Sequence, residues 1–159
     1  MLRAIAVLLT VCVIPAFGAE NLIANGEFTD GLEGWTPNRA ETEPAIDTEQ
    51  FHNPPAALRI PSTAERVGVQ TQLFELEPPL PNAVTVSGWV RADGHAERAS
   101  IGFDLRIVLD DGSETWFFPD SLQVRAADVG GWVQRTSTYI APTGRSVAGV
   151  AVYCLNYRS

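Results

Sequence analysis

Apolar and polar residues alternate along several short stretches of this chain, with the two-residue period of a β-strand. The clearest stretch, residues 83–92, has three valines on one face and Thr85, Ser87, Trp89 and Arg91 on the other. Residues 99–109 repeat the pattern, with five aliphatic or aromatic residues on one face. Each stretch is therefore predicted to be a strand with one buried face.

The same pattern predicts further strands, separated by proline, glycine and aspartate. They are expected at residues 45–48, 56–60, 67–76, 114–118, 132–140 and 147–155. Asp110-Asp111-Gly112 is a hairpin turn signal, and residues 121–128 are expected to be a loop with one helical turn at most. No long stretch has a helical period, so eight to ten short strands favour an all-β sandwich or barrel.

The segment 21–35, NLIANGEFTDGLEGW, is dense in turn residues. Asn25-Gly26 is expected to turn the chain, because both residue types tolerate a positive φ. Gly31 and Gly34 bracket a second turn before Trp35, a large apolar anchor. The segment therefore predicts a short strand, a tight loop and the start of a second strand.

Residues 1–18 resemble a secretory signal peptide. Arg3 supplies the positive charge, residues 4–14 are apolar, and Ala16 and Gly18 are the small residues expected before a cleavage site after Gly18. The apolar run is shorter than the roughly 20 residues of a membrane span. The sequence thus predicts an extracellular or periplasmic protein, with residues 20–159 as one β-sandwich domain and no membrane segment after cleavage.

Charge and cysteine content narrow the function classes. The net charge of −8 and the absence of lysine argue against a nucleic-acid partner, which needs a basic patch. Cys12 lies in the predicted signal, so Cys154 is left without a disulfide partner and is expected to be a small buried hydrophobe. His52 and His95 lie in predicted loops without metal-ligand spacing, so surface positions are expected for both.

Three segments together resemble the carbohydrate-binding modules of families 4, 9 and 22. They are the opening segment 21–35, the segment AVTVSGWVRAD and the segment GGWVQRTSTYIAPTGRSVAGVAVY, and the likeness spans about residues 21–153. The resemblance implies a galactose-binding-like jelly roll of two antiparallel sheets. It also implies binding of a polysaccharide such as a β-glucan or xylan in a groove, often a structural calcium, and association with glycoside hydrolases.

The chain departs from this family in two ways. The family usually ends with a further strand rich in small residues and aspartate. No such strand is expected here, and its absence would leave one sheet with an unpaired edge. Thr29 stands where the family often has an acidic residue after the phenylalanine of its opening motif. Glu27 and Asp30 are candidate substitutes as calcium ligands, although a solvated loop acid is the more common role. No cofactor is expected, and calcium is left open.

A groove that binds sugars needs exposed aromatic rings for the apolar sugar faces and polar groups for the hydroxyls. The strand faces suggest these ligand-binding candidates: Trp89, Arg91, Asp104, Arg106, Gln70, Gln72, Tyr153 and Trp116. If strands 83–92 and 99–109 pair, four of them would line one groove. Three points stay open: Trp89 can be an aromatic covered by a loop, and Asp104 and Arg106 can form a cross-strand surface salt bridge. Of the consecutive aromatics Trp116, Phe117 and Phe118, at least one must lie on each face, so the exposed one is undecided.

The leading hypothesis is a secreted, non-catalytic carbohydrate-binding module, with a catalytic partner domain or protein. The alternative is a structural or protein-interaction sandwich of the cell envelope that does not bind sugar, since a fold does not determine a function. An enzyme is disfavoured, because no serine-hydrolase, zinc-protease or phosphate-loop motif is present.

Overall fold

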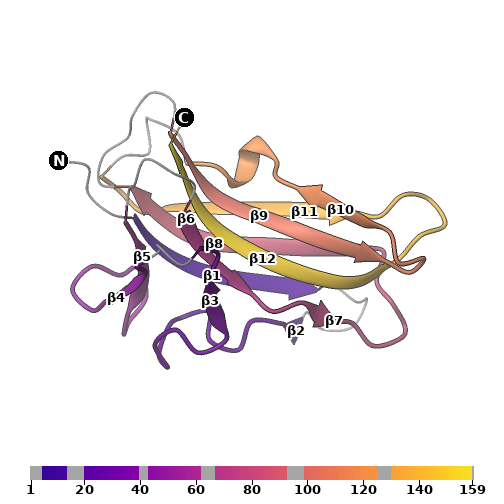
Figure 1. The fold of residues 1–159 in the computed structure, drawn as a ribbon, viewed down its shortest axis with the longest axis horizontal. Coiled ribbons are helices and arrows are strands. Elements are labelled where there is room, and N and C mark those ends of the chain that lie inside the picture. The colour runs from indigo at the N-terminus through magenta and orange to yellow at the C-terminus, as the bar shows by residue number, and fades with distance from the viewer. Residues whose placement is uncertain are drawn as a thin grey trace.

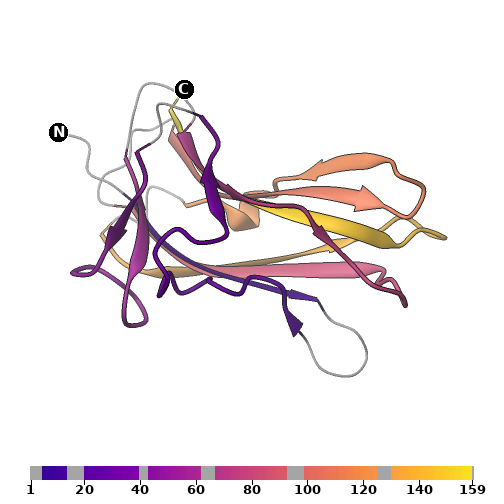
Figure 2. The ribbon, with the colours of Figure 1, turned by 60° about the horizontal axis from the view of Figure 1, so that its bottom comes forward.

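Two antiparallel sheets pack face to face in the computed structural model, which describes residues 5–13, 20–39, 43–61, 67–92, 99–124 and 130–158 (Figure 1). The turned view of Figure 2 shows the two layers, with β9, β10 and β12 in one and β1, β8 and β11 in the other. Within each sheet, all neighbouring strands that the structure describes pair in antiparallel orientation. The all-β jelly-roll sandwich expected from the alternation is therefore confirmed.

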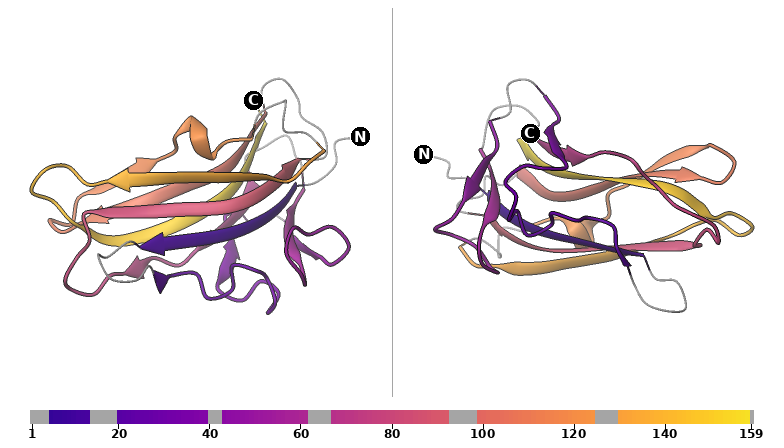
Figure 3. Two further views of the ribbon diagram at one scale, coloured as in Figure 1. Left: turned by 180° about the vertical axis from the view of Figure 1, so that it is seen from behind. Right: turned by 90° about the horizontal axis from the view of Figure 1, so that it is seen from below.

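Sheet A has the strand order β11-β8-β1-β5-β4, with β2 paired to one end of β1. Its strands are β1 (Ile5–Val13), β2 (Glu20–Asn21), β4 (Ala45–Asp47), β5 (Ala57–Ile60), β8 (Ala83–Ala92) and β11 (Val133–Ile140). Seen from behind, β11, β8 and β1 lie side by side (Figure 3). The residues predicted to be a signal peptide thus include a central strand of this sheet; their removal on export stays a prediction.

Sheet B has the order β10-β9-β12-β6-β3, with β7 paired to β12. Its strands are β3 (Trp35–Pro37), β6 (Val67–Thr71), β7 (Phe74–Glu75), β9 (Ala99–Leu109), β10 (Glu114–Phe117) and β12 (Val147–Arg158). The 3₁₀ turn η1 (Asp120–Leu122) follows β10, where one helical turn was expected. No helix in the described part of the chain has the length and hydropathy to cross a bilayer.

The core lies between the sheets and is built from the predicted apolar faces. Val84, Val86 and Val90 of β8 are fully buried, as are Phe103 and Leu105 of β9. Burying a side chain of this size stabilises a fold by about 1.5–3 kcal/mol relative to leaving it exposed. Cys154 is also fully buried, and burial raises the pKa of its thiol. The prediction of a small buried hydrophobe at this position is therefore confirmed.

The opening loop turns the chain at the predicted place, but with a different backbone geometry. Residues 24–27 form a turn, in which the N–H of Phe28 donates a 3.4 Å hydrogen bond to the carbonyl oxygen of Asn25. Neither Asn25 nor Gly26 has a positive φ; Phe28 does, at 57°. The Asn25 side chain is also buried and holds the loop through hydrogen bonds. The buried Phe28 ring packs on Trp35, with ring centroids 5.5 Å apart, and this contact offsets the strain of the left-handed backbone.

Candidate functional site

The outer face of sheet B gathers polar and aromatic side chains from neighbouring strands. The strand register aligns Asp104, Tyr153, Gln70 and Thr36 in one row across β9, β12, β6 and β3. Trp116 of β10 lies opposite Arg106 of β9 in the adjacent row. These residues point away from the core because their strand neighbours, such as Phe103 and Leu105, are fully buried. The fold thus brings together five of the eight predicted ligand-binding residues: Gln70, Asp104, Arg106, Trp116 and Tyr153.

Two aromatic rings provide an apolar surface on this face. Trp116 is 47% exposed, and its ring centroid lies 5.0 Å from that of the partly buried Tyr153 at an interplanar angle of 59°. Such a tilted pair contributes about 0.5–1.5 kcal/mol beyond its buried area and holds both rings in place. Phe118, which directly follows β10, is a further exposed aromatic at 63%. An exposed, fixed ring of this kind can pack against the apolar face of a sugar.

A guanidinium group is held beside the aromatic pair. Arg106 donates two hydrogen bonds to Glu114, from Nε to Oε2 at 2.9 Å and from Nη2 to Oε1 at 2.6 Å. The hydrogen bond and the charge of Arg106 lower the pKa of Glu114, and Glu114 in turn raises the pKa of Arg106, with a smaller contribution from Tyr153. Both groups stay ionised at neutral pH, and the bidentate geometry fixes the guanidinium plane. A cross-strand salt bridge of Arg106 was expected, but its partner is Glu114.

Asp104 occupies a more enclosed position in the same row. Its side chain is 3% exposed, although it lies on the outer side of β9. Its charge is one of the causes that raise the pKa of Cys154. Asp104 is therefore much less accessible to solvent than Trp116. It can support the site more readily than it can contact a ligand.

Trp89 and Arg91 lie on the opposite side of the molecule. They belong to β8 in sheet A, and their outward position follows from the buried valines between which they alternate. Strands β8 and β9 join different sheets, so the single groove expected from their pairing does not form. The reason is that the chain crosses from one layer of the sandwich to the other between these strands.

A loop residue covers Trp89. The ring of His52 stacks on it with a centroid distance of 3.7 Å and an interplanar angle of 11°, and Trp132 meets the His52 ring edge-on at 6.0 Å. His52 is itself joined to Asn53 by a 2.8 Å hydrogen bond. The alternative that Trp89 is an aromatic covered by a loop is therefore what the structure shows. One face of the indole is closed to a ligand.

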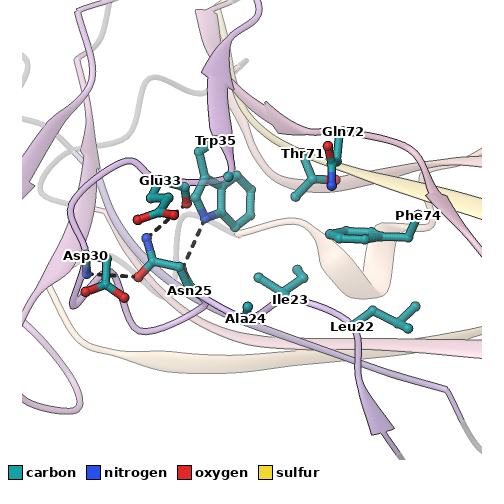
Figure 4. Close-up of a pocket in the computed structure, with 11 residues that line it drawn as sticks. Leu22, Ile23, Ala24, Asn25, Asp30, Glu33, Trp35, Thr71, Gln72 and Phe74 are labelled. Atoms are coloured by element: carbon teal, nitrogen blue, oxygen red, sulfur yellow. Dashed lines mark hydrogen bonds between the residues drawn. The ribbon is translucent and has the colours of Figure 1, made fainter.

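Gln72 lies apart from the row of Gln70, at a pocket of about 230 Å³ beneath the opening loop (Figure 4). Leu22 and Phe74 line one side of this pocket, and Asp30 and Glu33 lie on the other. Gln72 follows the last residue of β6, and this change of position explains why two glutamines of one predicted strand do not share a site.

The loop beside this pocket is organised by Asn25. Its Nδ2 donates to the carbonyl oxygens of Gly31 and Glu33, both at 3.0 Å, and its Oδ1 accepts from the backbone of Asp30 at 3.2 Å. Its backbone oxygen accepts a 3.2 Å hydrogen bond from Nε1 of Trp35 (Figure 4). An amide side chain therefore closes the loop from within.

The two candidate calcium ligands, Glu27 and Asp30, are both exposed residues of this loop. Asp30 lines the pocket, whereas Glu27 does not. Within the described residues, no group of three or more His, Cys, Asp and Glu side chains is placed to hold a metal ion. Calcium binding by these two residues stays a prediction.

Comparison with known proteins adds information about the fold. No family model and no curated protein matches the chain. Among solved structures, it is similar to the CBM22-1 xylan-binding domain of Paenibacillus barcinonensis Xyn10C, with a TM-score of 0.51 and 17% identity, covering 78% of this chain and 80% of that one. The C-terminal family 22 carbohydrate-binding module of Clostridium thermocellum Xyn10B gives a TM-score of 0.46 and 15% identity, covering 82% and 87%.

The chain therefore shares its jelly-roll fold with this CBM22-1 domain. The predicted resemblance is confirmed at the level of the fold, through family 22. The specific likeness to families 4 and 9 stays a prediction.

Sequence reasoning gave Glu114 and His52 no role on the two outer faces, and it left the exposure of Phe118 undecided. Glu114 holds Arg106, Phe118 extends the exposed aromatic surface, and His52 covers Trp89. Glu114 and Phe118 are each two residues from Trp116, so the two-residue period of this strand places them on the same side as Trp116. The hairpin register could therefore have predicted that Glu114 lies near Arg106. No local signal exists for His52, because it lies in a loop far from Trp89 in sequence.

Proposed function

We propose that this protein is a secreted, non-catalytic carbohydrate-binding module, and that its binding face is the outer face of sheet B. The observation that carries the proposal is the exposed Trp116–Tyr153 pair beside the fixed Arg106–Glu114 ion pair. The rings match the apolar face of a sugar, and the charged groups match its hydroxyls. Charge-assisted hydrogen bonds of this kind are among the strongest that a neutral ligand can receive.

The proposed ligand is a polysaccharide of the xylan or β-glucan type. The row of side chains from Tyr153 through Gln70 to Thr36 crosses three strands, so it can follow a ligand of more than one sugar unit. The solved structure with the same fold is named as a xylan-binding domain, which supports xylan as the first ligand to test.

Binding without catalysis is supported by the state of Glu114, the carboxylate beside the aromatic pair. A glycosidase needs one carboxylic acid with a raised pKa to protonate the leaving group. Arg106 lowers the pKa of Glu114 instead, so this group is held as a carboxylate. In our proposal, any hydrolysis comes from a separate catalytic domain or protein, and the apolar leader directs the chain out of the cytoplasm.

Affinity electrophoresis of the protein through gels that contain soluble xylan or β-glucan tests this function. We expect slower migration in at least one of these gels than in a gel without polysaccharide, and reversal by the matching free oligosaccharide. Equal migration in every gel would exclude the proposed function, and would favour the alternative of a structural or protein-interaction sandwich.

A further inference from the structure

The central position in sheet A is filled by the most apolar segment of the chain. Strand β1, with the sequence IAVLLTVCV, pairs with β8 from Ile5↔Ala92 to Val13↔Val84. It also pairs with β5 from Ile5↔Ile60 to Val7↔Leu58. The paired β1 and β8 can be followed side by side in Figure 3. Strand β1 thus pairs with β8 along almost the entire length of β8.

The two flanking strands do not pair with each other, because β1 lies between them in the sheet. Strand β8 pairs with β11 on its other side, and β5 pairs with β4. Without β1, both strands would present a row of unpaired backbone groups, which is a template for another strand. Leu58, Val86 and Val90 beside this position are fully buried, so the adjoining interior is apolar.

The same nine residues have the composition of a signal-peptide core, which is removed from exported proteins. One molecule cannot both lose this segment and keep it as a strand. Removal would open a slot of one strand's width between β8 and β5, with the backbone register already set for an antiparallel occupant.

We propose that the gap between β8 and β5 is a strand-binding slot. Strand β1 fills it in the full-length chain, and an extended apolar strand of a partner polypeptide fills it once a protease has removed that segment. The partner strand runs antiparallel to β8 and consists of apolar residues, because a polar strand would bring unsatisfied groups beside a buried interior. This inference does not depend on sugar binding.

A cut made after folding tests the slot in the full-length protein. A recognition site for a specific protease replaces residues 14–19, between β1 and β2, and the folded protein is then cut. A fluorescent peptide of residues 4–14 with a polar tag is added, and its binding is followed by fluorescence anisotropy. Hydrogen exchange of β8 and β5 is measured before the cut, after removal of the cut segment, and after addition of the peptide.

We expect the peptide to replace the cut segment and to restore the protection of amides in β8 and β5. The control peptide carries Val7→Pro, because Val7 pairs with both Val90 and Leu58 and its N–H lies in one of the two ladders. Loss of that donor in a central strand should weaken binding by about tenfold or more.

Two results would overturn the proposal. The first is full protection of β8 and β5 after the cut segment has left, because the strands would then have closed on each other. The second is equal binding of the peptide and its proline control. If removal of the segment unfolds the protein, refolding with the peptide must recover the circular dichroism of the sheet, and failure to recover it would also overturn the slot.

Discussion

Trp116 and Trp89 lie on opposite outer faces of the same sandwich, and their surroundings differ. Trp116 is 47% exposed on sheet B, tilted against Tyr153 and opposite the fixed Arg106. Trp89 on sheet A is partly buried beneath the stacked ring of His52. Trp89 alternates with buried neighbours along β8, and Trp116 alternates with partly buried neighbours along β10. An outward-pointing aromatic ring is thus open to a ligand only where no other part of the fold covers its surface.

The polar groups of the two outer faces also differ in how far their hydrogen-bonding capacity is already used. On sheet A, hydroxyl groups bind one another: Thr85 with Thr138, and Ser87 with Thr136, both at 2.8 Å. On sheet B, the polar groups include the charged pair of Arg106 and Glu114. The hydroxyl groups of sheet A already have partners, whereas charged groups can take further hydrogen bonds from a ligand.

The largest effect is expected on the free energy of unfolding, from a substitution that pushes apart two strands of sheet B. In Gly68→Ala, the new Cβ would overlap the backbone carbonyl oxygen of Cys154, so β6 would have to move away from β12. We expect a loss of about 3 kcal/mol in the free energy of unfolding, measured by urea denaturation. Gly131→Ala is the control, because no atom lies within 4 Å of its new Cβ. Equal stability of the two variants would contradict the tight packing of β6 on β12.

The next largest effect is expected on sugar binding, where substitution of Trp116 and of Trp89 should give different results. Trp116→Ala should weaken binding to the retained polysaccharide by roughly thirtyfold, because a central aromatic contact contributes about 2 kcal/mol. Trp89→Ala is the matched control and should bind as the unaltered protein does, although it loses the His52 stack. Titration calorimetry with an oligosaccharide measures both. A larger loss in Trp89→Ala would move the site to sheet A.

A smaller effect is expected from the ion pair and its pH dependence. Glu114→Gln should weaken sugar binding by roughly fivefold, because the guanidinium loses its charged anchor. In the unaltered protein, Arg106 holds the pKa of Glu114 below the ordinary value of a glutamate, so the pair is present at neutral pH and is lost as the pH falls through the lowered pKa. Affinity should therefore stay constant around neutral pH and decline only in the acidic range, at a lower pH than a free glutamate would titrate. A decline that begins near pH 6 would contradict this ion pair.

The smallest effect is expected from the cover of Trp89. His52→Ala should lower the free energy of unfolding by about 1 kcal/mol or less, because one stacked contact is lost. His52→Phe keeps an aromatic ring there and should restore most of the stability. Tryptophan fluorescence should report the exposed indole in the alanine variant, with sugar binding unchanged. New sugar binding by His52→Ala would show that the loop alone distinguishes the two faces.

Local sequence determined the strands and their buried faces. The bounds of β8 and β9 follow the predicted ranges 83–92 and 99–109, and the apolar side of each described stretch is buried. The reason is local: a two-residue period places alternate side chains on opposite faces, and the apolar face has to leave water. The same period placed Arg106 and Tyr153 on outward faces, whereas it left the face of Trp116 undecided.

Only the tertiary structure decided which strands share a sheet. Alternation states which side of β8 or β9 is buried, but pairing partners are chosen by contacts between distant segments. The predicted site was divided for this reason: Arg106 and Trp116 came together on sheet B, while Trp89 went to sheet A beneath His52. The apolar segment 5–13 shows the same limit, because a continuous apolar run has the composition of both a leader and a central strand.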